Sequence, residues 1–326
     1  MHDKQFSLDR RQLLIGSSAL ALGAAQLGAM PAFASAPLMH TRAPAFYRFE
    51  LGAFEATIIS DGPLNFPTKI FRGVPDADIQ QMLVADFLPA ATVRMEQNIL
   101  VINTGEKLIM IDTGILSMKA ANSTAGRILT SLGEAGIKPE SIDAIVLSHP
   151  HIDHAGGIMT PDGKTRLFPN AQIYTTEADF KFWTNEKLLG TPAQASVRTA
   201  LKNLLPNKDR LVMYKDGQEI FPGIHAMATP GHTVGHSSFM IQSNGQSLFY
   251  TGDVVLHEIM MENPKVAVSF DTDSDKGVET RMRVLDMLAH DKVQALIFHM
   301  AWPGVGHVVK AGSGYRFVPT PVLPVL

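Results

Sequence analysis

A run of histidines and one aspartate offers four metal-ligating side chains within six residues. It reads H-x-H-x-D-H and places His149, His151, Asp153 and His154 directly after a hydrophobic segment. In an extended segment His149 and His151 point to the same side, so both can bind one divalent ion. Asp153 and His154, beyond a turn, can reach a second ion. Because the 326 residues include no Cys, any metal must be held by imidazole and carboxylate groups.

Three further polar side chains each follow a predicted strand. His232 lies in a Pro-Gly-His-Thr sequence, Asp253 in Thr-Gly-Asp, and His299 after a short hydrophobic run. Loops at strand ends are where a rigid fold presents functional groups, so we expect these side chains to meet the histidine cluster. Two divalent ions that share a water lower its pKa from 15.7 to about 7. Such a site would supply hydroxide without a protein base.

The elements that must position these groups are strands and helices in two successive series. Alternating apolar residues predict hairpins over 47–58 and 98–111, and a buried strand over 142–147 leads into the histidine cluster. Further strands are predicted at 211–214, 224–228, 237–241, 247–250, 295–298 and 315–319, and helices at 124–136, 177–188, 193–205 and 278–289. We divide the chain into halves at about residue 170 and predict one domain with two sheets covered by helices.

The first 34 residues predict an export leader. Arg10 and Arg11 precede a weakly hydrophobic stretch, and an Ala-x-Ala sequence ends at Ala34. This pattern is typical of a twin-arginine signal peptide, and the stretch is shorter than the roughly 20 residues of a spanning helix. We predict cleavage after Ala34, one domain over 35–326 and a periplasmic or secreted location. An uncleaved N-terminal anchor is the alternative.

Composition excludes several classes of function. The chain has 28 basic and 31 acidic residues and no block of Lys and Arg, so no nucleic-acid partner is expected. The missing Cys excludes thiolate nucleophiles and iron–sulfur clusters, and no G-x-S-x-G sequence occurs. We expect no membrane span after removal of the leader.

The order of these motifs resembles that of the metallo-β-lactamase superfamily. The match is closer to methyl parathion hydrolase and its lactonase and esterase relatives, because of Ser60-Asp61-Gly62, Asp112-Thr113-Gly114 and the ending from Phe298 to Pro319. The resemblance implies a four-layer αβ/βα sandwich, an α/β fold of two mixed sheets flanked by helices, and a homodimer.

The resemblance also implies a role for each site residue. It assigns the first metal to His149, His151 and His232, the second to Asp153, His154 and His299, and the bridging position to Asp253. Side chains that orient the ligands would be Asp112, His236 and His307, and the substrate pocket would include Leu64, Phe66, Met118, Trp183 and His257. Zinc is the expected metal for both positions, with manganese, iron and cobalt as alternatives.

A bridging hydroxide would attack a carbonyl carbon or a phosphorus atom. Ile115 follows the Asp-Thr-Gly motif where methyl parathion hydrolase has a Phe, and 193–201 contains no aromatic residue. These differences predict an aliphatic pocket, and therefore hydrolysis of a lactone or aryl ester with weak phosphotriester (organophosphate) turnover. The alternatives are a dedicated organophosphate hydrolase, a β-lactamase and a non-catalytic periplasmic metal-binding protein.

Overall fold

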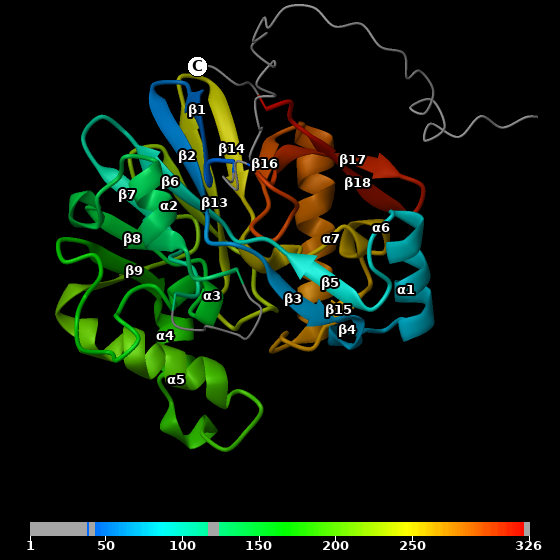
Figure 1. The fold of residues 1–326 in the computed structure, drawn as a ribbon, viewed down its shortest axis with the longest axis horizontal. Coiled ribbons are helices and arrows are strands. Elements are labelled where there is room, and N and C mark those ends of the chain that lie inside the picture. Colours follow the sequence, from blue (N-terminus) through cyan, green and yellow to red (C-terminus); the bar gives the residue numbers. More distant parts are fainter. Residues whose placement is uncertain (1–37, 39–42, 117–123, 323–326) are drawn as a thin grey trace, which may run out of the picture. The chain divides into compact units, whose positions relative to one another are not determined.

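Two mixed seven-stranded sheets form the centre of the structure, a computed structural model that describes residues 38, 43–116 and 124–322. Figure 1 shows both sheets, with helices on either side of them. In spatial order the first sheet consists of β1 (Phe46–Leu51), β2 (Phe54–Ser60), β6 (Asn98–Asn103), β7 (Leu108–Ile111), β8 (Ala144–Val146), β9 (Gln172–Thr176) and β10 (Leu211–Tyr214).

The second sheet contains a single parallel pair, β14 with β16, among antiparallel neighbours. Its order is β11 (Glu219–Phe221), β12 (Ile224–Ala228), β13 (Ser237–Ser243), β14 (Gln246–Tyr250), β16 (Gln294–Leu296), β17 (Val305–Ala311) and β18 (Gly314–Pro319). The β13–β14 hairpin turns at Asn244 and Gly245, both with positive φ (46° and 78°). The Asn-Gly pair therefore makes the predicted turn.

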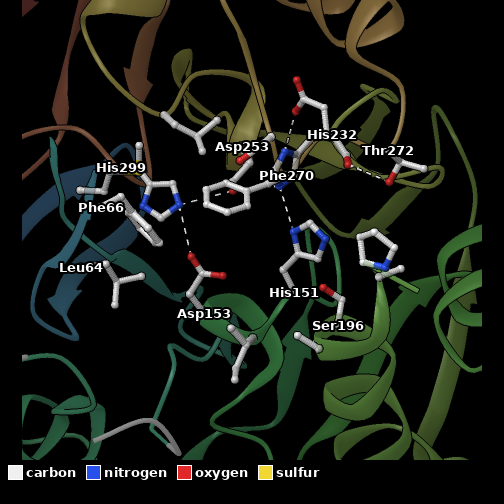
Figure 2. Close-up of a pocket in the computed structure, with 18 of the residues that line it drawn as sticks. Leu64, Phe66, His151, Asp153, Ser196, His232, Asp253, Phe270, Thr272 and His299 are labelled. Carbon is white, nitrogen blue, oxygen red and sulfur yellow. Dashed lines mark hydrogen bonds and ion pairs between the residues drawn. The ribbon is translucent and has the colours of Figure 1, made fainter. Parts of the chain in front are cut away.

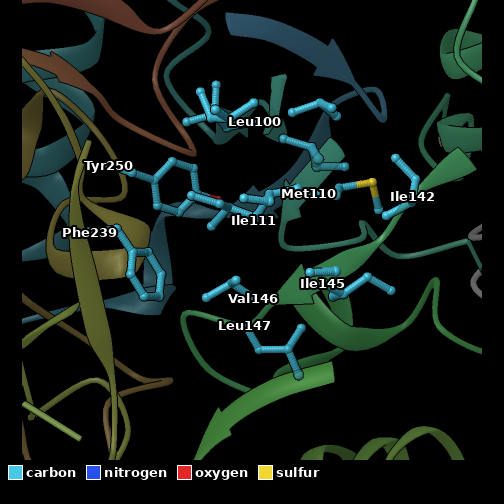
Figure 3. Packing of buried hydrophobic residues seen from close by; sticks show 14 of the residues in the cluster. Leu100, Met110, Ile111, Ile142, Ile145, Val146, Leu147, Phe239 and Tyr250 are labelled. Atoms are coloured by element: carbon cyan, nitrogen blue, oxygen red, sulfur yellow. The ribbon is translucent and has the colours of Figure 1, made fainter. Parts of the chain in front are cut away.

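The main core lies between the two sheets. Ile111 and Val146 of the first sheet belong to the same buried cluster as Phe239 and Tyr250 of the second, and Figure 3 shows these side chains facing one another. Each fully buried large apolar side chain contributes about 1.5–3 kcal/mol. The close packing of the two sheets holds their strand ends, and the loops that follow them, in fixed relative positions.

Helices cover the outer faces of the sheets. The longest, α7 (Ser274–Asp291), packs Val284, Leu285 and Leu288 onto the second sheet, because these positions share one face of a helix. The Asp273 carboxylate accepts a hydrogen bond from the backbone N–H of Lys276 and caps its first turn. The other helices are α1 (Asp76–Ala85), α2 (Ile128–Glu134), α3 (Ile152–Ala155), α4 (Glu177–Trp183), α5 (Gln194–Asn203) and α6 (Ile259–Glu262).

Several elements were not predicted from the sequence: the strands β9, β11 and β17, the helices α1, α3 and α6, and two small strand pairs. β3 (Leu64–Pro67) pairs with β5 (Thr92–Met95), and β4 (Phe71–Arg72) pairs with β15 (Ala267–Val268). They lie beside the second sheet in Figure 1. Strands of two to four residues carry too little periodic signal to be recognised in a sequence.

The predicted architecture of two mixed sheets flanked by helices is confirmed, but the division at residue 170 is wrong. β9 and β10 follow that point, yet they extend the first sheet, because β9 pairs in parallel with β8 and β10 pairs in parallel with β9. The predicted helix over 177–188 ends at Trp183, and a 3₁₀ turn, Glu186–Leu188, follows. Within the described residues no helix has the length and apolar character to cross a membrane. The leader 1–34 and Met118 lie outside the described residues.

Candidate metal centre

The seven predicted metal ligands lie together although they come from both sheets. The loop after β8 and helix α3 carry four of them, and the loops after β12, β14 and β16 carry His232, Asp253 and His299. The parallel strand β8 has residues buried on both faces, so its polar residues begin only where the strand ends. The sandwich thus delivers ligands from separate strand ends to one place.

The ligands form two groups. Donor atoms of His149, His151 and His232 lie within 4.8 Å of one another, as do those of Asp153, His154 and His299. Figure 2 shows His151 opposite His232 and Asp153 opposite His299. The first pair is 3.0 Å apart, from Nδ1 of His151 to Nε2 of His232, and the second is 3.3 Å apart, from Oδ2 of Asp153 to Nε2 of His299.

Asp253 lies between the two groups. Its Oδ2 is 3.2 Å from Nε2 of His232, in the first group, and 3.4 Å from Nε2 of His299, in the second. Its Oδ1 is 3.2 Å from Nε2 of His154. The carboxylate is only 3% exposed. This is the position that a carboxylate shared by two cations requires.

Several of these donor atoms have no hydrogen-bond partner. Nε2 of His149, Nε2 of His154 and Oδ1 of Asp253 are buried, and none of their contacts, the 3.2 Å approach of His154 to Asp253 included, has the geometry of a hydrogen bond. Burying such groups without partners costs roughly 1–3 kcal/mol each. Imidazole nitrogens and carboxylate oxygens are suitable ligands for zinc and similar divalent ions, so the residues present fit two such ions.

The electrostatics of the cluster also fit cations. Burial lowers the pKa of His151 to about 3, which leaves this imidazole neutral and able to ligate. Burial also opposes the charged form of His232 and His299, but hydrogen bonds to Asp253 and Asp271 raise the pKa of His232 to about 9, and Asp253 raises that of His299 to about 10. Nearby positive charge therefore stabilises the buried carboxylates, and bound divalent ions can supply that charge.

Three ligands are oriented through the ring nitrogen that faces away from the centre. Nδ1 of His154 lies 2.7 Å from Oδ2 of Asp112, as expected for an orienting residue. Nδ1 of His299 lies 2.7 Å from the backbone carbonyl of Glu96, and Nδ1 of His232 lies 3.0 Å from Oδ1 of Asp271. Such contacts fix the ring and direct Nε2 to a metal.

Sequence reasoning missed two side chains in this support. Asp271 was not singled out, although it lies in an acidic run that begins helix α7. Tyr250, the last residue of β14, donates a 2.7 Å hydrogen bond to Oδ2 of Asp112. No local pattern connects Tyr250 to Asp112, because they are 138 residues apart.

The two remaining histidines predicted to support the ligands differ in placement. Nε2 of His236 accepts a 2.9 Å hydrogen bond from the backbone N–H of Asp253, and the His236 ring lies 5.1 Å from that of His149. His307 lies in β17, where it pairs with Val318. Among the described residues no hydrogen bond joins His307 to a predicted ligand, so the structure does not bring it into the cluster.

A cavity of about 740 Å³ opens above the cluster. Leu64, Phe66 and Trp183 line it as predicted. Its walls are more aromatic than the sequence indicated, because Phe182 and Phe270 also contribute. Figure 2 shows Phe66 and Phe270 at the cavity, and their ring centroids are 5.3 Å apart. Within 193–201 the lining residues are the small Ala193, Ala195 and Ser196, so the expected absence of an aromatic side chain there stands.

His257, which we expected in the pocket, is not among the described residues that line this cavity. Leu256 lines the cavity, whereas His257 packs edge-on to Phe71, with ring centroids 6.3 Å apart. His257 is only 7% exposed, so its ring lies within the protein.

Comparisons with known proteins agree with this geometry. The chain is 27% identical over 194 residues to an N-acyl homoserine lactonase of Bacillus cereus, a match that covers 59% of this chain and 66% of that protein. Its structure is similar to that of AidC, described as a dizinc quorum-quenching lactonase (TM-score 0.77, 28% identity, 86% of this chain and 98% of that one). It is also similar to the structure of the hydrolase AbOPH, with a TM-score of 0.80 and 28% identity. That match covers 86% of this chain and 99% of AbOPH.

A sequence profile extends this likeness to the family level. Residues 93–298 match the profile of the Metallo-beta-lactamase superfamily. The match begins at β5 and ends one residue before His299, so it includes six of the seven predicted ligands. Together with the two facing sheets and the cluster at their strand ends, it shows that the chain belongs to the metallo-beta-lactamase superfamily.

Proposed function

We propose that this protein is a dinuclear zinc hydrolase that opens lactones, with aryl esters as further substrates. The observation that carries the proposal is the convergence of seven His and Asp side chains at the base of a cavity with apolar and aromatic walls. The likeness to N-acyl homoserine lactonase and to AidC supports a lactone as substrate.

Some residues of the site would hold the metals, and others would contact the substrate. Two bound zinc ions supply an activated water and a Lewis acid for the carbonyl oxygen. The imidazoles and Asp153 would hold them, and Asp253 would be shared. Leu64, Phe66 and Trp183 provide apolar surface for the part of the substrate that does not react, and this binding orients the carbonyl group over the cluster.

The test is a metal analysis and a substrate panel on two variants. Asp253→Ala removes the shared carboxylate, and Asp291→Ala removes an exposed carboxylate at the end of α7 and serves as control. The panel contains N-hexanoyl homoserine lactone, dihydrocoumarin, paraoxon and nitrocefin. We expect two zinc ions per chain and lactone turnover for the unmodified protein and the control, and a loss of at least about 100-fold in kcat/KM for Asp253→Ala.

Three results would contradict the proposal. Full activity of Asp253→Ala would remove the dinuclear mechanism. Turnover of nitrocefin alone would favour a β-lactamase, and zinc binding without hydrolysis of any substrate would favour a metal-binding protein.

A second activity, hydrolysis of aryl phosphotriesters, is favoured by the aromatic walls. Phe66, Phe270, Phe182 and Trp183 surround the cavity, and aromatic leaving groups stack on such side chains. This is the feature that would relate the protein to methyl parathion hydrolase. We expect paraoxon turnover below lactone turnover, because the Ile115 wall lacks an aromatic ring. A higher kcat/KM for paraoxon than for every lactone would reverse the order.

Export and pairing of two chains are also proposed. The paired arginines of the leader support export in the folded state, and the family resemblance supports a homodimer. Fractionation of cells that express the full chain tests export. The variant Arg10→Lys/Arg11→Lys is expected to remain in the cytoplasm. Sedimentation of the mature protein tests the second.

A further inference from the structure

Asp179 is a fully buried carboxylate outside the metal cluster that contacts both the pocket and a ligand loop. It lies in α4, and its Oδ1 accepts a 3.2 Å hydrogen bond from Nε1 of Trp183, one turn later. Oδ1 also accepts from the backbone N–H of Gly235 at 2.9 Å, and Oδ2 accepts from Oγ1 of Thr233 at 2.8 Å. Burial raises the pKa of Asp179 to about 6 despite these bonds.

The loop from Thr229 to His236 and the start of α4 are in direct contact around this carboxylate. Oγ1 of Thr176, which caps α4, donates to the carbonyl of Gly235 at 3.1 Å. A Cβ atom at Gly235 would collide with the Thr176 hydroxyl and lie 2.8 Å from the Asp179 nitrogen. The loop and the start of α4 are therefore closely packed at Gly235.

The same helix touches the other end of the first ligand group. The Trp183 ring lies edge-on to His151, with centroids 5.0 Å apart, and it is 3% exposed at the cavity wall. Thr233, which bonds to Asp179, directly follows His232. Asp179 is thus hydrogen-bonded to Thr233, which is next to the ligand His232, and to Trp183, which packs on the ligand His151.

We propose that Asp179 is a positioning residue that fixes the Trp183 wall of the substrate cavity relative to the loop carrying the metal ligand His232. The inference rests on the proposed function and deepens it, because it assigns one carboxylate to both substrate binding and metal binding. Asp179 touches neither substrate nor metal. It acts through Trp183 and through the Thr233–Gly235 backbone.

The main experiment compares Asp179→Ala with Asp179→Asn. Alanine removes all three acceptor contacts. Asparagine keeps an oxygen for Trp183 and Gly235, and its amide can donate to the Thr233 hydroxyl. We expect Asp179→Ala to weaken zinc binding by about 10–100-fold and to raise KM for N-hexanoyl homoserine lactone several-fold. Asp179→Asn should restore both to within about threefold. Lys181→Ala, an exposed residue of the same helix, is the matched control.

Two single-contact variants separate the two connections. Thr233→Val should weaken zinc binding with little change in KM, and Trp183→Phe, which keeps a ring but loses the N–H donor, should raise KM with little change in zinc affinity. Zinc affinity is measured by competition with a chelator, independently of activity. These variants decide the question if Asp179→Ala does not fold.

Fluorescence provides a readout without substrate. The chain has two tryptophans, so a Trp302→Phe background isolates Trp183, which contacts His151. Zinc should change its emission, and Asp179→Ala should shift that titration to higher zinc. The inference is overturned if Thr233→Val, together with Asp179→Ala where that variant folds, binds zinc within twofold of the unmodified protein. If the unmodified protein hydrolyses no lactone, the proposed function fails, while the zinc titration still tests Asp179.

Discussion

At the scale of single residues, Asp271 determines how well His232 can serve as a ligand. Its Oδ1 is 3.0 Å from Nδ1 of His232, and its Oδ2 accepts from the backbone N–H of Val268 at 3.2 Å. The carboxylate is therefore itself held in place and can fix the His232 ring. An anionic partner also increases the basicity of a ligating imidazole.

We predict that Asp271→Ala lowers zinc affinity by about 10–100-fold without unfolding the protein. Asp275→Ala, in the first turn of α7, is the control and should bind zinc normally. Chelator competition measures both. Unchanged zinc affinity in Asp271→Ala would show that the backbone alone positions His232.

A second residue-scale prediction concerns Asp61, whose carboxylate accepts hydrogen bonds from the backbone N–H groups of Ile115 and Ile128. Burial raises its pKa from 3.8 to about 7, against these hydrogen bonds. The folded protein thus keeps a proton that the unfolded chain loses near pH 4. Its contribution to the free energy of unfolding is therefore largest at low pH and decreases as the pH rises to about 7, by up to about 4 kcal/mol.

Asp61→Asn tests this, because the amide does not titrate. Urea unfolding at pH 5 and pH 8 should show that the unmodified protein loses stability relative to the variant as the pH rises. An equal difference at both pH values would contradict the raised pKa.

Whether the role of a residue can be predicted from the sequence depends on how far along the chain its partners lie. His149 and Asp153 could be recognised because the spacing of the cluster is local. Asp179 and Tyr250 could not, because Thr233 lies 54 residues from Asp179 and Asp112 lies 138 residues from Tyr250. Their roles arise only when the sheets pack.

At the scale of elements, Arg281 attaches α7 to the segment between Asp253 and Asp271. It is 1% exposed. Nε donates to the carbonyl of Val254 at 2.9 Å, and Nη1 donates to those of Pro264 and Val266 at 2.8 and 2.6 Å. One guanidinium group thus orders the chain between two residues of the site.

We predict that Arg281→Met destabilises the protein by about 3 kcal/mol, because three buried carbonyl groups lose their donor. Lys276→Ala, an exposed position on the same helix, should change the free energy of unfolding by less than about 0.5 kcal/mol. Urea unfolding measures both. A loss below 1 kcal/mol for Arg281→Met would mean that water replaces the guanidinium group.

The elements also show where pattern reasoning succeeds. β7, β10 and β12 have their predicted bounds, since alternation and turn residues are local signals. The assignment of β9 and β10 to the first sheet could not be predicted, because parallel pairing joins segments that are separated by long connections.

At the scale of the whole molecule, the site connects the two sheets. His149, His151, Asp153 and His154 follow a strand of the first sheet, and His232, Asp253 and His299 follow strands of the second. The two metals would therefore link the two sheets, in addition to the apolar packing and the hydrogen bonds that already join them. The unfolded chain cannot hold these ligands together, so metal binding favours the folded state.

This linkage predicts the effect of metal removal on stability. Zinc at 100 times its dissociation constant stabilises the folded state by about 2.7 kcal/mol, which corresponds to roughly 5–10 °C in Tm for a domain of this size. Thermal unfolding with and without a chelator should show that decrease, and added zinc should reverse it. Asp253→Ala, which lacks the shared carboxylate, should show a much smaller change. An equal decrease in Asp253→Ala would mean that zinc stabilises one half of the molecule without linking the two sheets.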